Sequence, residues 1–268
     1  MIEAQRIGSG RPLVLVHGLG GSWRSWLPVL DALKARREVV ALNLPGHGGS
    51  PARAESGTFG GLADSLEQYI LDQGLKGADV AGISLGGRLV LELARRGSVG
   101  DVVALDPGGF WQGWERPYFR WTLTASLRLL RLLRGQIPRL SASAVTRTAL
   151  LVQLSARPWA LSRELVAREL ISFADTATVG PLIRDLAKGP AQRGPRAPTA
   201  GRVTIGWGRK DRLCPPHQAK RAKAAFPDAR LHWFEASGHY SIWDSPGEAA
   251  DLILKYTGAG EPLDQGSP

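Results

Sequence analysis

The sequence predicts an α/β protein, built on a doubly wound, mostly parallel sheet with a helical lid insertion. Three observations support this fold class. Short apolar runs that stop at Gly or Pro are typical of strands buried on both faces. Stretches with helical periodicity alternate with these runs, which indicates parallel βαβ units. The alternation then stops after Asp106 and resumes near residue 202.

The strand-like runs are rich in β-branched and other apolar residues. They lie at 11–18, 38–48, 78–84, 101–109, 202–208 and 229–236. The helical stretches begin at a capping Ser or at Pro, or end at Gly. They lie at 22–35, 58–74, 85–97, 215–227 and 246–258. Residues 2–16 predict two strands around Gly8-Ser9-Gly10, as an antiparallel hairpin at the edge of the sheet.

The middle of the chain has a different pattern. Residues 110–188 are helical, rich in Trp, Arg and Leu, and contain no convincing strand. We expect them to form a lid over the carboxyl ends of the strands, where open α/β sheets bind ligands. The expected domains are a core at 1–109 and 189–258, the lid at 110–188, and a disordered tail at 259–268. Residues 189–201 are a Pro- and Gly-rich connector.

Composition limits the class of protein. The chain has 268 residues, 43% of them hydrophobic, which suits one sizeable core. Its single cysteine, Cys214, excludes an intramolecular disulfide. No secretory leader and no apolar window of about 18 residues is present, so the expected location is the cytoplasm.

The net charge is +10, and residues 107–188 contribute 12 Lys and Arg against 5 Asp and Glu, which is +7. Solvated arginine-rich faces account for such an excess, and we expect no nucleic-acid partner.

The stretch Ala81-Gly82-Ile83-Ser84-Leu85-Gly86-Gly87 contains the pattern G-x-S-x-G between a predicted strand and a predicted helix. A serine at the top of such a bend needs a strained backbone conformation. Glycines two residues away on either side let the strand and the helix approach without Cβ clashes. The pattern therefore makes Ser84 a candidate nucleophile.

Five segments together resemble the serine-nucleophile, esterase- and lipase-like branch of the α/β-hydrolase fold family. They are VHGLGG (16–21), NLPGHGGS (43–50), GISLGG (82–87), WGRKDRLCP (207–215) and ASGHYSIWDSP (236–246). The resemblance extends over nearly the whole chain, and the order and spacing of the segments are more specific than any one of them.

The resemblance implies a catalytic triad in the order nucleophile, acid, base, which Ser84, Asp211 and His239 match. His239 would take the proton of Ser84, and Asp211 would orient the imidazole. By the same resemblance, the N–H groups of Leu19 and Leu85 would form an oxyanion hole. Asp106 also ends a predicted strand and is an alternative acid.

Other polar residues are expected to have structural roles. His17 orders the glycine-rich loop, His47 orients a turn, and Asp244 supports the histidine loop. Cys214 is expected to be buried and inert. No side-chain spacing suggests a metal site, and no cofactor is expected.

The lid contains an amphipathic helix at 117–135, with a polar stripe that includes Arg120, Thr124, Arg128, Arg131 and Arg134. One interpretation is that its apolar surface packs on the body and on the core of the lid, with the arginines in water. The other is that the helix contacts anionic lipid or an acidic carrier thioester. Three tryptophans are candidate substrate-binding residues, namely Trp111, Trp114 and Trp121.

The predicted activity is hydrolysis of a carboxylic ester with an apolar acyl group, through an acyl-serine intermediate. Thioester cleavage, lactone opening, carbon–carbon bond hydrolysis and perhydrolysis remain alternatives on the same triad. A ligand receptor without enzymatic activity is the alternative from another class. The sequence leaves the natural substrate and the oligomeric state open.

Overall fold

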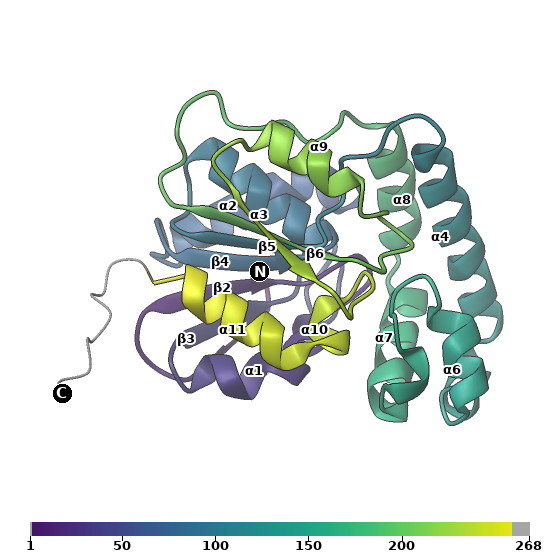
Figure 1. Cartoon of the computed structure of the whole chain (residues 1–268). Coiled ribbons are helices and arrows are strands. Elements are labelled where there is room, and N and C mark those ends of the chain that lie inside the picture. Colours follow the sequence, from purple (N-terminus) through teal and green to yellow (C-terminus); the bar gives the residue numbers. More distant parts are fainter. Residues whose placement is uncertain (1, 259–268) are drawn as a thin grey trace.

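A seven-stranded sheet forms the centre of the protein, whose computed structural model describes residues 2–258 (Figure 1). The strands are β1 (Ala4–Ile7), β2 (Pro12–Val16), β3 (Glu38–Leu42), β4 (Asp79–Ile83), β5 (Val102–Leu105), β6 (Val203–Gly208) and β7 (Arg230–Phe234). Their order in the sheet is β1-β3-β2-β4-β5-β6-β7, and every pair except β1–β3 is parallel. The predicted mostly parallel sheet is confirmed. The predicted tail at 259–268 lies outside the described residues.

The predicted hairpin at the amino terminus is wrong. β1 does lie at the edge of the sheet, but it pairs antiparallel with β3, with Ala4 opposite Leu42. β2 has parallel partners on both sides, β3 and β4, and so offers no free edge to β1. The glycines in the turn let the chain pass over to β2, since Gly8 has φ 88° and a Cβ there would lie 2.4 Å from the carbonyl oxygen of Arg37.

Helices cover both faces of the sheet, because alternate residues of each strand point to opposite sides. Leu13 and Leu15 pack in the apolar cluster that includes residues of α1 and α11, whereas Val14 and Val16 pack in the cluster that includes residues of α2 and α3. These helices are α1 (Leu27–Lys34), α2 (Phe59–Asp72), α3 (Leu85–Arg96), α9 (Gln218–Ala225), α10 (Ser241–Asp244) and α11 (Pro246–Tyr256). The helices expected from the sequence pattern are therefore found in their predicted places.

The chain between β5 and β6 forms a separate group of helices on one side of the sheet, at the right of Figure 1. They are α4 (Glu115–Leu132), α5 (Ile137–Leu140), α6 (Ala144–Leu151), α7 (Arg163–Asp175) and α8 (Val179–Lys188). α4 packs on α7 and α8 through a stripe that includes Phe119, Leu123 and Leu127, all buried. None of the helices within residues 2–258 is long and apolar enough to cross a membrane.

Candidate active site

Ser84 lies at the bend where β4 ends and α3 begins, with φ 57° and ψ −114°. Few non-glycine residues adopt such a positive φ, so the neighbours must allow it. A Cβ on Gly82 would lie 2.3 Å from the carbonyl oxygen of Gly86, and a Cβ on Gly86 would lie 2.0 Å from that of Val16. Both contacts are too short, so the two glycines are needed to bring strand and helix together. The strand–turn–helix context predicted for the motif is present.

Three side chains from distant parts of the chain meet at this bend. His239 Nε2 lies 2.8 Å from the Ser84 Oγ, and His239 Nδ1 lies 2.7 Å from Asp211 Oδ2. His239 and Asp211 are buried, and both lie on loops that follow strands, after β7 and β6 respectively. Because parallel strands end at one edge of a sheet, the loops after β4, β6 and β7 converge there. The structure thus brings together the three residues of the predicted triad.

Asp211 is held in place by its other oxygen. The Asp211 Oδ1 accepts the backbone N–H groups of Leu213 and Cys214, each at 2.8 Å, which leaves Oδ2 for the imidazole.

Asp106, the alternative acid, has a different partner, because its Oδ1 accepts the N–H of Gly208 at 2.7 Å. Burial, together with the nearby Asp211 carboxylate, raises the pKa of Asp106 well above its ordinary value. The hydrogen bonds therefore pair His239 with Asp211.

The two backbone donors expected at the oxyanion hole also lie beside Ser84. Leu19 and Leu85 line the same cavity as Ser84, and neither N–H donates a hydrogen bond to another residue within 2–258. His17 fixes the loop before Leu19, since its Nδ1 donates to the carbonyl of Gly18 at 2.7 Å and its Nε2 accepts the N–H of Leu44 at 3.0 Å. Burial and then the neighbouring His47 lower the pKa of His17 to about 3, so the ring is neutral.

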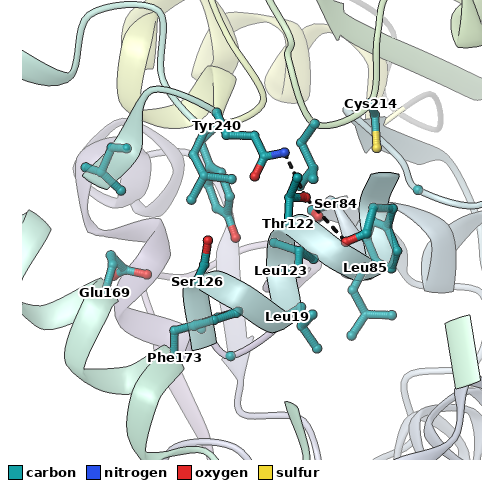
Figure 2. A pocket seen from close by; sticks show the side chains of 18 of the residues that line it. Leu19, Ser84, Leu85, Thr122, Leu123, Ser126, Glu169, Phe173, Cys214 and Tyr240 are labelled. Carbon is teal, nitrogen blue, oxygen red and sulfur yellow. Dashed lines mark hydrogen bonds between the residues drawn. The ribbon is translucent and has the colours of Figure 1, made fainter. Parts of the chain in front are cut away.

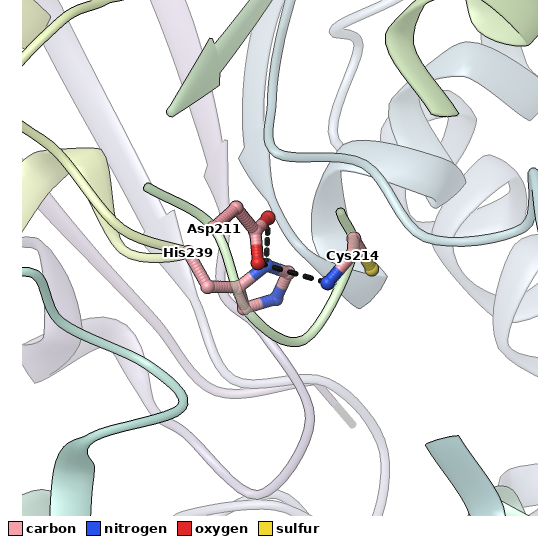
Figure 3. Close-up of side chains that lie close together, drawn as sticks. All are labelled: Asp211, Cys214 and His239. Atoms are coloured by element: carbon pink, nitrogen blue, oxygen red, sulfur yellow. Dashed lines mark hydrogen bonds and ion pairs between the residues drawn. The ribbon is translucent and has the colours of Figure 1, made fainter. Parts of the chain in front are cut away.

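Cys214 lies next to the acid and base, as Figure 3 shows. One ligand atom each from Asp211, Cys214 and His239 lies within 4.8 Å of the others, a spacing that a metal ion could use. Both ring nitrogens of His239 are already paired, with Asp211 and with Ser84. Burial first, and then nearby carboxylates, raise the pKa of the Cys214 thiol well above its ordinary value, which favours the protonated thiol. The hydrogen bonds alone account for this cluster.

A cavity of about 340 Å³ opens beside Ser84 (Figure 2). Trp111 lines it and is buried against Phe119, with ring centroids 4.5 Å apart. Trp114 and Trp121 are outside its lining and are 63% and 72% exposed, which corrects their expected place at the substrate. In sequence, Trp121 lies two residues from each of two inward residues of α4, Phe119 and Leu123. Residues two apart on a helix point in nearly opposite directions, so Trp121 points outward.

Asp244 joins the helical segment to the histidine loop. Its Oδ1 accepts the Ser155 hydroxyl at 2.5 Å, and its Oδ2 accepts the N–H groups of Ala156 and Gly238, each at 2.8 Å. The predicted supporting position of Asp244 beside His239 agrees with these contacts.

Glu169 and Tyr240 are among the cavity residues that the sequence interpretation missed. Tyr240 directly follows the triad histidine, which is a signal that could have drawn attention to it. Glu169 occupies an inward position on α7, among apolar neighbours in the helical pattern.

Comparison with known proteins identifies the family of this chain. A model of the alpha/beta hydrolase family matches residues 13–252, so the chain belongs to that family. The chain is 28% and 30% identical to the dihydrolipoyllysine-residue acetyltransferase components of the acetoin cleaving systems of Cupriavidus necator and Pseudomonas putida, over 95% and 92% of this chain. It spans only 66% and 63% of the length of those two relatives.

An esterase relative and a lactonase of the same fold match this chain over more of their own length. The chain is 28% identical to a pimeloyl-[acyl-carrier protein] methyl ester esterase of Aromatoleum aromaticum, over 90% of this chain and 96% of that protein. The enol-lactonase of Burkholderia xenovorans LB400 superposes with a TM-score of 0.74 at 19% identity, covering 95% of each chain. This structural likeness shows the shared fold.

Proposed function

We propose that the protein hydrolyses carboxylic esters through an acyl intermediate on Ser84. The observation that carries this proposal is the continuous hydrogen-bond chain from the Ser84 Oγ through His239 to Asp211, at 2.8 and 2.7 Å. A relative named as a methyl ester esterase, which aligns over almost its whole length, supports the ester as the bond that is cleaved.

In the proposed first half-reaction, His239 Nε2 accepts the proton of Ser84 while Oγ attacks the ester carbonyl carbon. The carbonyl electron pair moves to oxygen, and the N–H groups of Leu19 and Leu85 stabilise the negative charge. Asp211 holds the proton on Nδ1 and stabilises the imidazolium. The intermediate then collapses, the alkoxide leaves with the proton from His239, and the acyl group remains on Ser84.

In the second half-reaction, water replaces the alcohol. His239 accepts a proton from that water as its oxygen attacks the acyl carbon, and the same two N–H groups hold the second oxyanion. Collapse of this intermediate breaks the bond to Oγ, and His239 returns the proton to Ser84. The acid leaves and the enzyme is restored.

The cavity supports an apolar acyl group as the substrate's main part. Leucine and aromatic side chains supply most of its walls, and its volume of about 340 Å³ suits a short or medium chain. Residues from α4, α6, α7 and α8 form much of the lining, which supports the proposal that residues 110–188 act as a lid on a core of 1–109 and 189–258.

Hydrolysis of p-nitrophenyl esters of graded chain length tests the proposal. We expect wild type to release p-nitrophenol, and Ser84→Ala to lose at least 10³-fold in kcat/KM. Ser9→Ala, at an exposed turn after β1, is the matched control and should keep the wild-type rate. Equal rates in wild type and Ser84→Ala would refute the acyl-serine step. Faster cleavage of acyl-CoA thioesters, lactones or carbon–carbon bonds in diketones than of the esters would identify that bond as the one the enzyme cleaves.

We also propose that the outer face of α4 contacts an anionic lipid surface. Trp121 and Leu132 are 72% and 82% exposed on this helix, and Arg120, Arg128 and Arg131 are exposed among them. Exposed aromatic and aliphatic side chains beside arginines are typical of helices that bind anionic membranes in the interface plane. The inward stripe of α4 packs on α7 and α8, so the outer face is the one available to the lipid.

Co-sedimentation with vesicles tests this contact. We expect binding to phosphatidylglycerol vesicles, little binding to phosphatidylcholine vesicles, and a loss of at least fivefold in Trp121→Ala/Leu132→Ala. Leu71→Ala, which removes a 46% exposed leucine from α2, is the control. Equal binding of both lipids, or no effect of the double variant, would refute the lipid contact. Binding of an acidic carrier protein without vesicle binding would favour the other partner.

A further inference from the structure

The Tyr240 hydroxyl and the Glu169 carboxylate are among the buried polar groups that line the cavity beside Ser84 and that the proposed reaction does not use. Figure 2 shows the oxygen ends of Tyr240, Glu169 and Ser126 turned toward the same part of the cavity. A buried polar group without a partner is costly, so the unpaired Tyr240 hydroxyl points to a ligand that can pair with it, and the Glu169 carboxylate beside the same space is a further acceptor for that ligand.

The Tyr240 hydroxyl lies close to the reacting serine. A Cβ built on Gly18 would lie 2.4 Å from this hydroxyl oxygen and 3.3 Å from the Ser84 Cβ, so both atoms border the same small space. The ring is fixed by stacking on Trp243, with centroids 3.8 Å apart and an interplanar angle of 16°. Within residues 2–258 the hydroxyl makes no hydrogen bond to side chain or backbone. The O–H is therefore a positioned donor beside the reaction site.

The Glu169 carboxylate is buried on α7 with only 8% of the residue exposed. Its Oε2 accepts the hydroxyl of Ser25 at 2.7 Å, and its Oε1 has a longer bond, 3.3 Å, to Nε of Arg168. A carboxyl oxygen can accept more than one hydrogen bond, so Glu169 retains acceptor capacity toward the cavity. Burial raises the pKa of Glu169. Burial first, and then the charge of Glu169, raise the pKa of Tyr240, which keeps the phenol protonated as a donor.

A hydroxyl group is the chemical partner that can pair with both residues, whose oxygen ends turn toward the same part of the cavity. It accepts one hydrogen bond, from the Tyr240 O–H, and donates one, to the Glu169 carboxyl. A plain alkyl chain in the same place would pair with neither group, and the Tyr240 hydroxyl would stay without a partner. Since the Tyr240 hydroxyl borders Ser84, the matching group on a bound ester lies only a few atoms from the carbonyl carbon.

We propose that Tyr240 and Glu169 form a subsite for a hydroxyl group on the acyl chain, close to the ester carbonyl. The substrate class is then a hydroxyacyl ester whose remaining carbons fill the apolar part of the cavity. This inference rests on the proposed function, because it places the acyl chain in the cavity beside Ser84.

The test compares p-nitrophenyl hexanoate with its 2-hydroxy and 3-hydroxy derivatives. In wild type we expect kcat/KM for at least one hydroxy ester to exceed that for hexanoate at least tenfold. Tyr240→Phe and Glu169→Gln should each reduce this ratio at least fivefold. Tyr118→Phe is the matched control and should keep the ratio, because the Tyr118 hydroxyl also lies at the cavity but already donates to the carbonyl oxygen of Arg212 at 2.8 Å. A wild-type ratio near one, or an unchanged ratio in both variants, would overturn the subsite.

A binding measurement separates failure of the subsite from failure of the esterase proposal. Calorimetry on Ser84→Ala should show at least tenfold tighter binding of 2- or 3-hydroxyhexanoate than of hexanoate, and Tyr240→Phe on this background should remove the difference. We expect this difference in binding even if the protein hydrolyses no ester. Absence of ester hydrolysis together with this binding difference would refute only the esterase function. Ester hydrolysis with equal binding of all three acids would refute only the subsite.

Discussion

Asp211→Asn keeps the size of the acid but replaces one of its oxygens with an N–H donor. In the wild type, Oδ1 accepts two backbone N–H groups and Oδ2 accepts His239 Nδ1–H. The amide oxygen of the variant stays with the backbone donors, because the opposite orientation would set NH₂ against N–H groups. The NH₂ then faces Nδ1 of His239 and favours the tautomer with its proton on Nε2. That nitrogen can no longer accept the proton of Ser84.

The expected loss follows from this change of tautomer. In a serine protease triad the same substitution lowers kcat about 10⁴-fold. A factor of 10⁴ corresponds to about 5.5 kcal/mol of transition-state stabilisation. Rotating the amide by 180° would break its two hydrogen bonds to the backbone, at about 1 kcal/mol each. This cost disfavours the orientation that would restore the active tautomer of His239.

The assay is the steady-state rate on a p-nitrophenyl ester, with thermal unfolding as a check that the variant is folded. Asp106→Asn is the matched control. Asp106 Oδ1 accepts the N–H of Gly208, a bond that an amide oxygen can also accept, and burial raises the pKa of this carboxyl, which favours its neutral form. We expect this control to lose less than tenfold in kcat/KM. A folded Asp211→Asn that keeps a tenth of the wild-type rate, or a 10³-fold loss in Asp106→Asn, would refute the assignment of the acid.

Two predictions concern stability. Asp244→Ala removes the acceptor for the Ser155 hydroxyl and the N–H of Gly238, and leaves these buried donors unpaired. Urea unfolding should therefore show a free energy of unfolding that is lower by about 3 kcal/mol. A decrease of less than about 1 kcal/mol would contradict this prediction. Burial lowers the pKa of His17 to about 3 and of His47 to about 4, from 6.5 in the unfolded chain. Each histidine therefore contributes about 2 kcal/mol of stability at pH 7 that is lost on acidification to pH 5, as the unfolded chain takes up protons. Urea unfolding of His47→Gln should show a smaller loss between pH 7 and 5 than wild type, and equal losses would exclude this origin.

Much of the fold could be predicted because it depends on local patterns. Buried parallel strands need continuous apolar runs, and the helices between them need one apolar stripe and a capping residue at an end. The pairing of β1 could not be read in this way. An isolated strand next to a glycine turn looks the same whether it pairs with β2 or β3, and the choice depends on which strand still has a free edge.

The sequence by itself determined the strand–helix alternation, the bend at Ser84 and the order of the three residues that meet there. Each of these features depends only on neighbouring residues or on the order of the motifs along the chain. The tertiary structure alone decided that His239 pairs with Asp211 and not Asp106, that Trp121 faces solvent, and that Tyr240 and Glu169 share a cavity. The physical reason is that hydrogen bonds and burial are set by distances of a few ångströms between segments far apart in the chain, which no local pattern encodes.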